Sequence, residues 1–326
     1  MCAVLTASKI RCPGAPVQQD AHRRTYIVSI YLGPMFLLRS LFGVALAYVA
    51  LVVLAWLVQE RLAFPAPRAP LPDPKVLGIP HGERIELVMG DGTKLAGWYL
   101  RAVEEPPQPS PALLWFYGNG ENIAGIWQIL RDFQPPGAAL LVVDYPGYGG
   151  SEGRATEAGM YAAADAAYAA LVARPEVDPK RIYVYGRSLG SAPATYSVTR
   201  HPAAGLILES PFTNAAEMAR EAYRILPRFI LRLSLDNLSR IKQVRCPVLL
   251  FHGTADRLVP TAMGMKLAAA APGPVEVVLI HGAGHNDTYD VGGREYRDKV
   301  WGFVTGTPAV IEGRTGGRAD RRTGGE

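Results

Sequence analysis

Cysteine is scarce in this 326-residue chain, and the three that occur are far apart. Cys2, Cys12 and Cys246 are too few and too scattered for a disulfide framework or a metal cluster. A basic patch interleaved with aromatic residues is missing too, because several positive residues of this chain of net charge +5 lie in the two terminal tails. We therefore expect neither a redox centre nor a nucleic-acid partner.

Charge is absent from residues 41–58, LFGVALAYVALVVLAWLV. As a helix, this run would be about 27 Å long, close to the hydrocarbon thickness of a bilayer. A core helix of a soluble protein is the alternative, but such a helix normally keeps one polar face. We predict a single membrane-spanning helix.

Basic residues outnumber acidic ones before this run, whereas the charges just after it are nearly balanced. This asymmetry predicts a cytoplasmic N-terminus and places the remaining chain on the extracytoplasmic side. A cleaved signal peptide is the alternative, but the run is long for one and WLVQERLAF offers no small-x-small cleavage site. The predicted span is thus a signal anchor. Met35 is an alternative to Met1 as the start, because MFLLRSLFGV already reads as an anchor with one basic residue.

The rest of the chain alternates short apolar runs with helical patterns. The first two runs, 85–89 and 94–100, flank GDG and predict an antiparallel hairpin. The later runs are continuously apolar, as in parallel strands that are covered on both faces. We predict an α/β domain with a mostly parallel sheet and helices on both faces. The predicted organisation is an N-terminal cytoplasmic segment (1–40), the anchor (41–58), a proline-rich linker (59–80), the α/β domain (81–304) and a disordered tail (305–326).

Residues 211–245 interrupt this alternation with a helical pattern broken at Pro227, and we interpret them as a small helical lid. Four arginines in it recur at every fourth position, which would place them on one helical face. They are Arg220, Arg224, Arg228 and Arg232. Apolar residues lie between them, so we hypothesise that the lid meets the membrane and admits lipid-like acyl substrates, although a solvated face is the simpler alternative.

The stretch RIYVYGRSLGSAPATYSVTR predicts a strand followed by a helix, with G-x-S-x-G at the corner. The pattern alone is weak, but its position between strand and helix is the one in which a serine is held in a strained, exposed turn. Gly186 and Gly190 would be required there because side chains would collide with the neighbouring strand and helix. Ser188 is therefore the candidate nucleophile.

A serine nucleophile needs a histidine base, and that base needs a carboxylate to fix its tautomer. His285 follows Gly-Ala-Gly after the last strand, where the chain can reach back over the sheet, whereas His281 directly continues that strand. His201 and His252 end a helix and a strand and are explained as local structure. Asp256 follows a strand end, where α/β sheets place their chemistry. Asp287 is the alternative acid, but a helix cap suits it better.

An oxyanion intermediate needs two backbone donors. Leu189, directly after the nucleophile, supplies one, and Asn119 in the loop YGNGEN supplies the other. A plain glycine turn is the alternative interpretation of that loop.

Six ordered segments, YGNGEN, VVDYPGYGGSEG, VYGRSLGSAPA, LESPFT, CPVLLFHGTADRLVP and GAGHND, together resemble the serine α/β-hydrolase superfamily, in particular its membrane-anchored Bem46-like branch. The resemblance spans residues 60–304 and implies the α/β-hydrolase fold with Ser188, Asp256 and His285 as catalytic triad. The sequence has Tyr117 where the family usually has histidine. Tyr117 and Phe212 are candidates for the substrate pocket, Glu209 is as well explained by loop structure, and Asp144 is expected to anchor a loop.

We therefore expect a serine hydrolase that cleaves carboxylic esters or thioesters, with lipid-like acyl groups among its candidate substrates, without metal or organic cofactor. An acyltransferase or a serine peptidase would use the same corner. A catalytically silent, membrane-anchored interaction domain is the alternative from another class. Acyl chain length, leaving group and oligomeric state are not encoded in these patterns.

Overall fold

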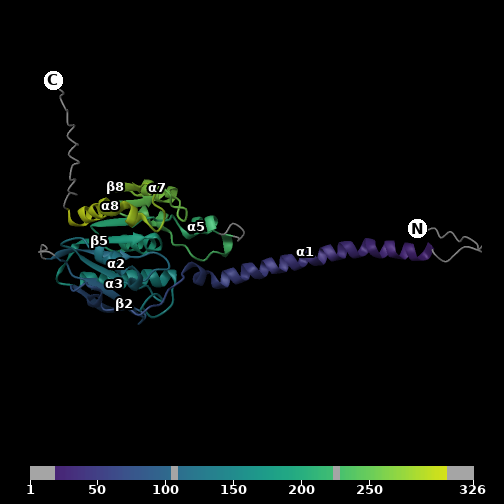
Figure 1. Cartoon of the computed structure of the whole chain (residues 1–326), viewed down its shortest axis with the longest axis horizontal. Helices are drawn as coiled ribbons and strands as arrows, with labels where there is room; N and C mark the ends of the chain where they lie inside the picture. The colour runs from purple at the N-terminus through teal and green to yellow at the C-terminus, as the bar shows by residue number, and fades with distance from the viewer. Residues whose placement is uncertain (1–18, 104–108, 223–227, 307–326) are drawn as a thin grey trace, which may run out of the picture. The chain divides into compact units, whose positions relative to one another are not determined.

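The computed structural model describes residues 19–103, 109–222 and 228–306 (Figure 1). The chain forms two compact units, Met1–Leu57 and Val58–Glu326. Nearly all of the predicted disordered tail, from residue 307 on, lies outside the described residues, as does the first part of the predicted cytoplasmic segment.

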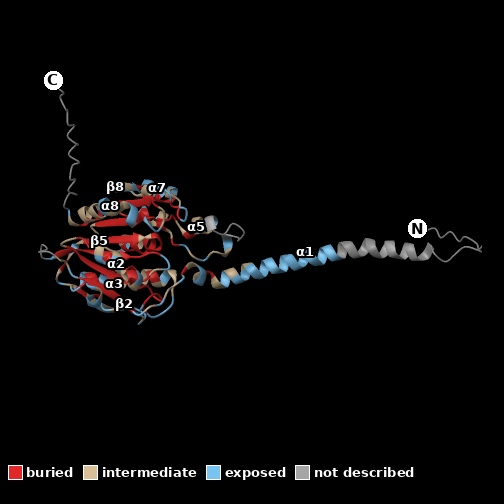
Figure 2. Ribbon diagram, viewed as in Figure 1, coloured by how far each residue is buried: buried red, intermediate tan, exposed pale blue. Residues whose placement is uncertain are grey.

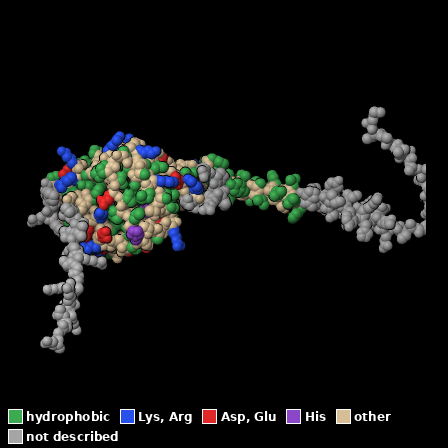
Figure 3. Space-filling model, turned by 90° about the horizontal axis from the view of Figure 1, so that it is seen from above, with side chains coloured by type: hydrophobic (Ala, Val, Ile, Leu, Met, Phe, Trp, Pro, Cys, Tyr) green, Lys and Arg blue, Asp and Glu red, His purple; other side chains and the backbone are tan. Residues whose placement is uncertain are grey.

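The N-terminal unit contains most of a single long helix, α1 (Gln19–Ala63). Its large apolar side chains are exposed where they are described, with Phe36 and Phe42 exposed by 75% and 70% (Figures 2 and 3). The section Phe36–Ala63 is long and apolar enough to cross a membrane. A helix that exposes apolar side chains on every side has no stable place in water, so a bilayer is the solvent it suits.

The limits of α1 differ from those of the predicted anchor at both ends. The helix begins at Gln19, inside the predicted cytoplasmic segment, and continues past residue 58 to Ala63. The predicted limits of the anchor are the positions at which charged residues stop and begin again. Such positions mark a change from water to bilayer and do not mark the end of a helix. The C-terminal limit has a local cause, because Pro65 disfavours helical backbone at the residue before it.

A single sheet forms the centre of the second unit. Its strands are β1 (Gly82–Val88), β2 (Lys94–Leu100), β3 (Ser110–Phe116), β4 (Ala139–Val143), β5 (Val177–Arg187), β6 (Gly205–Glu209), β7 (Val248–Gly253) and β8 (Val275–Ile280). They lie side by side in the order β1, β2, β4, β3, β5, β6, β7, β8. β1 and β2 form the predicted antiparallel hairpin, β2 is antiparallel to β4, and all later pairs are parallel. The predicted mostly parallel α/β sheet is confirmed.

Helices cover both faces of this sheet (Figure 1). The α-helices are α2 (Ile123–Phe133), α3 (Glu157–Val172), α4 (Ser191–Arg200), α5 (Ala215–Ala222), α6 (Asn237–Ile241), α7 (Thr261–Ala270) and α8 (Thr288–Thr305). The 3-10 turns are η1 (Pro74–Leu77), η2 (Ser188–Gly190) and η3 (Arg228–Ile230). Trp301 of α8 donates to the Phe133 carbonyl at the end of α2, so these two helices share a face. Tyr196 of α4 donates to Asp165 of α3 on the other face.

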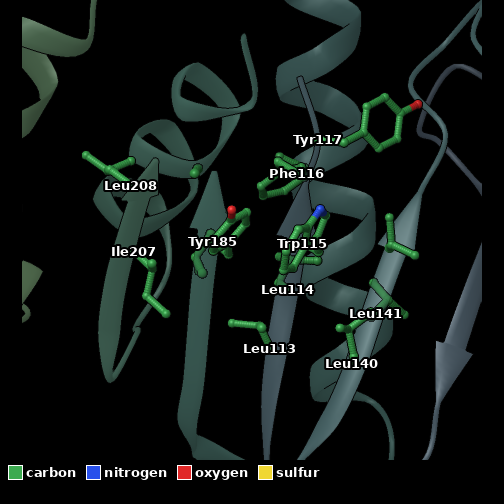
Figure 4. Close-up of a cluster of buried hydrophobic side chains, with 14 of the residues drawn as sticks. Leu113, Leu114, Trp115, Phe116, Tyr117, Leu140, Leu141, Tyr185, Ile207 and Leu208 are labelled. Carbon is green, nitrogen blue, oxygen red and sulfur yellow. The ribbon is translucent and has the colours of Figure 1, made fainter. Parts of the chain in front are cut away.

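The core is centred on β3 and β5, whose aromatic side chains interlock with the α2 and α8 face. The rings of Trp115 and Tyr185 stack with centroids 3.7 Å apart (Figure 4). Phe133 and Tyr296, from α2 and α8, complete this layer. Every residue of β3 is buried. The carboxyl ends of these strands therefore form a rigid edge, on which the loops described below are held.

Residues 59–80, the predicted proline-rich linker, belong to the second unit and pack into it. Phe64, Leu71 and Ile79 are buried in its core. The indole N–H of Trp98 donates to the Pro72 carbonyl at 3.0 Å. The prediction of a linker rests on the prolines and takes no account of the apolar side chains between them, and burial of those side chains fixes the segment in the domain.

The predicted lid is only partly helical. α5 ends at Ala222, η3 is a single turn, and α6 lies beyond a non-helical stretch that includes Leu235 with a positive φ of 41°. Arg220 and Arg232 therefore do not share a helical face, and Arg224 lies outside the described residues. The expectation that the arginines share one helical face therefore fails for these two residues, whereas Pro227, where the pattern is predicted to break, lies outside the described residues.

Candidate active site

Ser188 lies at the sharp corner between β5 and α4, as the sequence predicts. Its φ of 49° is in the left-handed region, which residues with a Cβ rarely adopt. The strain is tolerated because the two neighbouring glycines allow close packing. A Cβ on Gly190 would lie 2.2 Å from the Phe116 carbonyl oxygen, and one on Gly186 would lie 2.5 Å from the Ala194 Cβ. The expected collisions with strand and helix are thus present at both positions.

The structure brings Ser188, His285 and Asp256 together from three separate strand ends. His285 Nε2 lies 2.8 Å from Ser188 Oγ, and His285 Nδ1 lies 2.7 Å from Asp256 Oδ2. A carboxylate accepts hydrogen bonds, so the Nδ1 proton is donated to Asp256. Nε2 is then the nitrogen that accepts the hydroxyl proton of Ser188. The arrangement can increase the nucleophilicity of the serine and hold a transferred proton on the imidazole.

Asp256 is held in place by the loop that follows β7. Its Oδ1 accepts the N–H groups of Leu258 and Val259 at 2.9 and 2.8 Å, which leaves Oδ2 for His285. Burial opposes its charge, but hydrogen bonds from His252, His285 and Val259 outweigh burial and hold the pKa of Asp256 well below its ordinary value. The carboxylate is therefore ionised at neutral pH and able to stabilise an imidazolium.

The alternative site residues have other partners. His252 is fully buried, and its Nε2 donates to the Val259 carbonyl at 2.9 Å. The same nitrogen lies 3.5 Å from Asp256 Oδ2. His201 pairs with Asp165. Asp287 accepts the Gly284 N–H at 2.6 Å and is the residue before α8, so it fixes the turn that presents His285.

The loop after β3 contains Asn119, the second predicted oxyanion donor. Its side chain is held at both ends: the amide N–H donates to the Ala63 carbonyl at 2.7 Å, and the amide oxygen accepts from the Tyr148 hydroxyl at 2.9 Å. Its backbone N–H donates to none of the described residues. Gly190 packs against the Tyr117 carbonyl at the start of this loop, so the loop lies beside the corner that presents Leu189. The donor roles of Asn119 and Leu189 stay predictions.

Tyr117, a candidate for the substrate pocket, is buried, and its pocket role stays a prediction. Its side chain is only 1% exposed, donates to Asp144 Oδ1 at 3.0 Å and accepts the Tyr145 N–H at 3.1 Å. Asp144 also accepts the Ile123 and Gly150 N–H groups, so it anchors the loop as expected. The Tyr117 hydroxyl is the hydrogen-bond partner of the buried Asp144 carboxylate, because a buried polar group needs a partner.

Glu209 is the last residue of β6, and Phe212 lies in the loop that follows it. Phe212 is buried, and its carbonyl accepts from the Asn237 amide at 2.9 Å. Its pocket role stays a prediction. Glu209 lies in the core beneath the site, where it accepts hydrogen bonds from Arg187, Thr288 and two tyrosines.

Sequence reasoning missed Arg187 and Glu121, which connect the loops of this site. Arg187 donates to the carbonyl of His285 and pairs with Glu121 of the oxyanion loop. The only signal was the arginine inside G-R-S-L-G, and its partners lie too far away in sequence to be identified. No group of three or more His, Cys, Asp or Glu side chains suited to a metal ion occurs in the part of the chain that the structure describes.

Comparisons with known proteins agree with this geometry. A family model described as alpha/beta hydrolase fold matches residues 111–234. The chain is 35% identical over 274 residues to uncharacterized protein Rv2307c of Mycobacterium tuberculosis, covering 82% of this chain and 94% of that protein. It is 34% identical over 218 residues to alpha/beta hydrolase domain-containing protein 17B of Homo sapiens, covering 66% of this chain and 72% of that protein.

Two solved structures are similar to this chain in fold. The Pyrococcus furiosus esterase Pf2001 gives a TM-score of 0.59 at 20% identity, covering 73% of this chain and 97% of that chain. The acetyl xylan esterase from Paenibacillus sp. R4 gives 0.52 at 20% identity, covering 67% and 81%. At this level of identity the likeness shows the fold alone. None of these relatives carries the Bem46 name, so that branch stays a prediction with which they are consistent.

Proposed function

The chain belongs to the α/β-hydrolase family, and we propose that it is a membrane-anchored serine hydrolase of carboxylic esters or thioesters. One observation carries the proposal: a continuous hydrogen-bonded series from Ser188 Oγ through the His285 imidazole to the Asp256 carboxylate, with distances of 2.8 and 2.7 Å. An interaction domain without catalysis has no need for a strained serine aligned with a base and an acid.

The first half of the reaction forms an acyl-enzyme. Ser188 Oγ attacks the carbonyl carbon of the substrate while its proton passes to His285 Nε2. The N–H groups of Leu189 and Asn119 would stabilise the oxyanion, and Asp256 would stabilise the imidazolium. Collapse of the tetrahedral intermediate breaks the bond to the leaving alcohol or thiol, which takes the proton from His285. The acyl group is then joined to Ser188 by an ester bond.

The second half releases the acid. Water donates a proton to His285 Nε2 and attacks the acyl carbonyl, and the new intermediate expels Ser188, which regains the proton. The products are a carboxylic acid and free enzyme. An alcohol in place of that water would give acyl transfer, so the acceptor decides between hydrolase and transferase.

The lid segment supports lipid-like acyl groups as substrates. Gln59, the residue after the predicted span 41–58, donates to the Ile230 carbonyl at 3.2 Å and accepts the Arg232 N–H at 2.7 Å. Phe229 beside them is 87% exposed. An exposed aromatic ring in a segment that is hydrogen-bonded to Gln59 suits a membrane interface. We infer an N-terminus in the cytoplasm and a catalytic domain on the other side, from the charge asymmetry alone.

A fluorophosphonate probe tests the proposal directly, because it is attacked only by an activated serine. We expect the full chain in detergent micelles to be labelled on Ser188, and the Ser188→Ala variant to stay unlabelled. We also expect release of p-nitrophenol from p-nitrophenyl esters, at rates that depend on acyl chain length. Folded native protein that neither takes up the probe nor hydrolyses any ester of the series would contradict the proposal. Esters of added alcohols among the products would identify a transferase.

A further inference from the structure

Arg187, directly before the proposed nucleophile, uses its guanidinium to contact two loops and the end of strand β6. Its side chain is only 14% exposed. Nη2 donates to the His285 carbonyl and to Asn286 Oδ1, each at 3.0 Å. Nη1 donates to Glu121, and Nε donates to Glu209 at 3.2 Å. Four hydrogen bonds thus radiate from one planar group to residues that lie as far as 99 positions away in sequence.

Glu121 carries this connection into the oxyanion loop. Its Oε1 accepts from Arg187, and its Oε2 accepts the Gly118 N–H at 2.7 Å. Gly118 directly precedes Asn119, whose N–H is the proposed oxyanion donor. A Cβ on Gly118 would lie 2.9 Å from Arg187 Nη1 and 3.1 Å from Glu121 Oε2. The guanidinium and the carboxylate therefore pack directly against the backbone of this loop.

Glu209 fixes the guanidinium from below. Its side chain is 2% exposed, and it also accepts hydrogen bonds from the hydroxyls of Thr288 and Tyr296, at the start and in the middle of α8. Burial alone would lower the pKa of Arg187, but the carboxylates of Glu209 and Glu121 outweigh it and raise that pKa. The cation is therefore permanent, and its fixed position is transmitted to α8, which follows the His285 loop.

We propose that Arg187 is a positioning residue that holds the His285 loop and the oxyanion loop in register with Ser188. It touches no reacting atom. It sets the distance between the base, the nucleophile and the oxyanion donor by bonding to the backbone of one loop and, through Glu121, to the backbone of the other. The inference rests on the proposed function, because it describes the alignment of that same site.

Lysine would not replace arginine in this role. The guanidinium offers five donors in a planar fork, and here it directs them to Glu209, Glu121 and the His285 loop at once. An ammonium offers three donors from one atom, so at least one of the four hydrogen bonds of Arg187 would be lost. Misplacement of a catalytic group by about 1 Å can cost about 100-fold in rate.

The test compares Arg187→Gln, Arg187→Lys and Glu121→Ala with Arg181→Gln as a matched control. Arg181 lies in the first half of β5, six residues before Arg187, where it pairs with Asp178 at 2.8 Å. We expect Arg187→Gln to lower kcat by about 100-fold and to change KM by less than about threefold, because the loss concerns alignment in the transition state. Arg187→Lys is expected to recover little of this loss. We expect Glu121→Ala to lower kcat by about tenfold and Arg181→Gln to leave it within about twofold.

The double variant Arg187→Gln, Glu121→Ala separates positioning from separate structural effects. If both residues act through one connection, its loss in kcat equals that of Arg187→Gln alone. Three outcomes would each overturn the inference. The first is a double variant whose loss in kcat equals the product of the two single losses. The others are a folded Arg187→Gln variant within about threefold of native kcat and full recovery of kcat by Arg187→Lys. Should Arg187→Gln fail to fold because Glu209 is left unpaired, Glu121→Ala decides alone, because Glu121 is 25% exposed. Lack of fluorophosphonate labelling in the native chain would instead contradict the proposed function itself.

Discussion

Replacement of Asp256 by asparagine tests the orientation of the imidazole of His285, the proposed general base. Asp256 Oδ1 accepts two backbone N–H groups, from Leu258 and Val259. In Asp256→Asn, the amide oxygen would keep these two bonds, because the amide nitrogen cannot accept them. The NH₂ group must then face His285 Nδ1, which lies 2.7 Å from the native Oδ2. The geometry of the site is kept while the polarity of one hydrogen bond is reversed.

This reversal changes the tautomer of His285. When Nδ1 accepts a proton from the asparagine amide, the ring proton moves to Nε2, which then cannot accept the hydroxyl proton of Ser188. The charge that stabilises the imidazolium is lost as well. The corresponding change in a well-characterised catalytic triad lowers kcat by roughly 10⁴-fold with its geometry intact, equivalent to about 5.4 kcal/mol in activation free energy.

The assay is release of p-nitrophenol from a p-nitrophenyl ester, followed under saturating substrate for native and variant protein. Asp287→Asn is the matched control. Asp287 lies in the same loop as His285, and its Oδ1 accepts the Gly284 N–H, a bond that an asparagine oxygen can keep. We expect this control to stay within about threefold of native. The reasoning is refuted if folded Asp256→Asn keeps more than about one hundredth of native kcat, or if both variants lose activity equally.

Three further outcomes follow from the same structure. Gly190→Ala should lower the free energy of unfolding by about 3 kcal/mol in urea titrations, because the new Cβ would lie 2.2 Å from the Phe116 carbonyl, whereas Gly125→Ala meets nothing closer than 3.4 Å and should cost nothing. Because folding lowers the pKa of Asp256, its charge stabilises the fold above about pH 4, and this contribution is lost as pH falls further. In chemical denaturation, the difference in free energy of unfolding between native protein and Asp256→Asn should therefore shrink from about pH 5 to pH 2. Gln59→Leu removes two hydrogen bonds to residues 230–232 and should reduce the preference for vesicle-dispersed over soluble esters by about threefold. An unchanged ratio of the two hydrolysis rates would contradict a role of the lid in access to membrane-dispersed substrates.

The strand-to-helix corner could be predicted because its signal is local. Gly186, Ser188 and Gly190 lie within five residues, and the strained φ of Ser188 and the close approach of both glycines are short-range consequences of that turn. His285 and Asp256 were predictable for a different reason. Parallel strands bring their carboxyl ends to one edge, so residues just after strands meet there even when they are distant in sequence.

The limits of α1 and the broken lid could not be read from the same patterns. Hydropathy reports which solvent a residue suits, and the helix crosses that boundary at both ends of the predicted anchor. In the lid, fourfold spacing predicted a helical face, but spacing carries no information on whether the backbone stays helical between the arginines. The hydrogen bond of Tyr117 could not be predicted for a similar reason: its position in the loop was known, but not the buried carboxylate of Asp144 to which its hydroxyl turns.

Arg187 shows most clearly what such patterns omit. The sequence places it beside the nucleophile, where its charge would suit solvent or substrate equally well. Its role depends on Glu121, 66 positions before it, and on the His285 carbonyl, 98 positions after it. Both are reached only once β3, β5 and β8 have aligned their ends. A backbone carbonyl has no sequence signature, and a glutamate at the fifth position of a loop has an ambiguous one. Residues that would touch the reacting atoms are thus recognisable by their chemistry, whereas residues that align them are recognisable only by their partners. The effect of an aligning residue such as Arg187 on kcat is therefore the measurement that distinguishes a positioning role from ordinary packing.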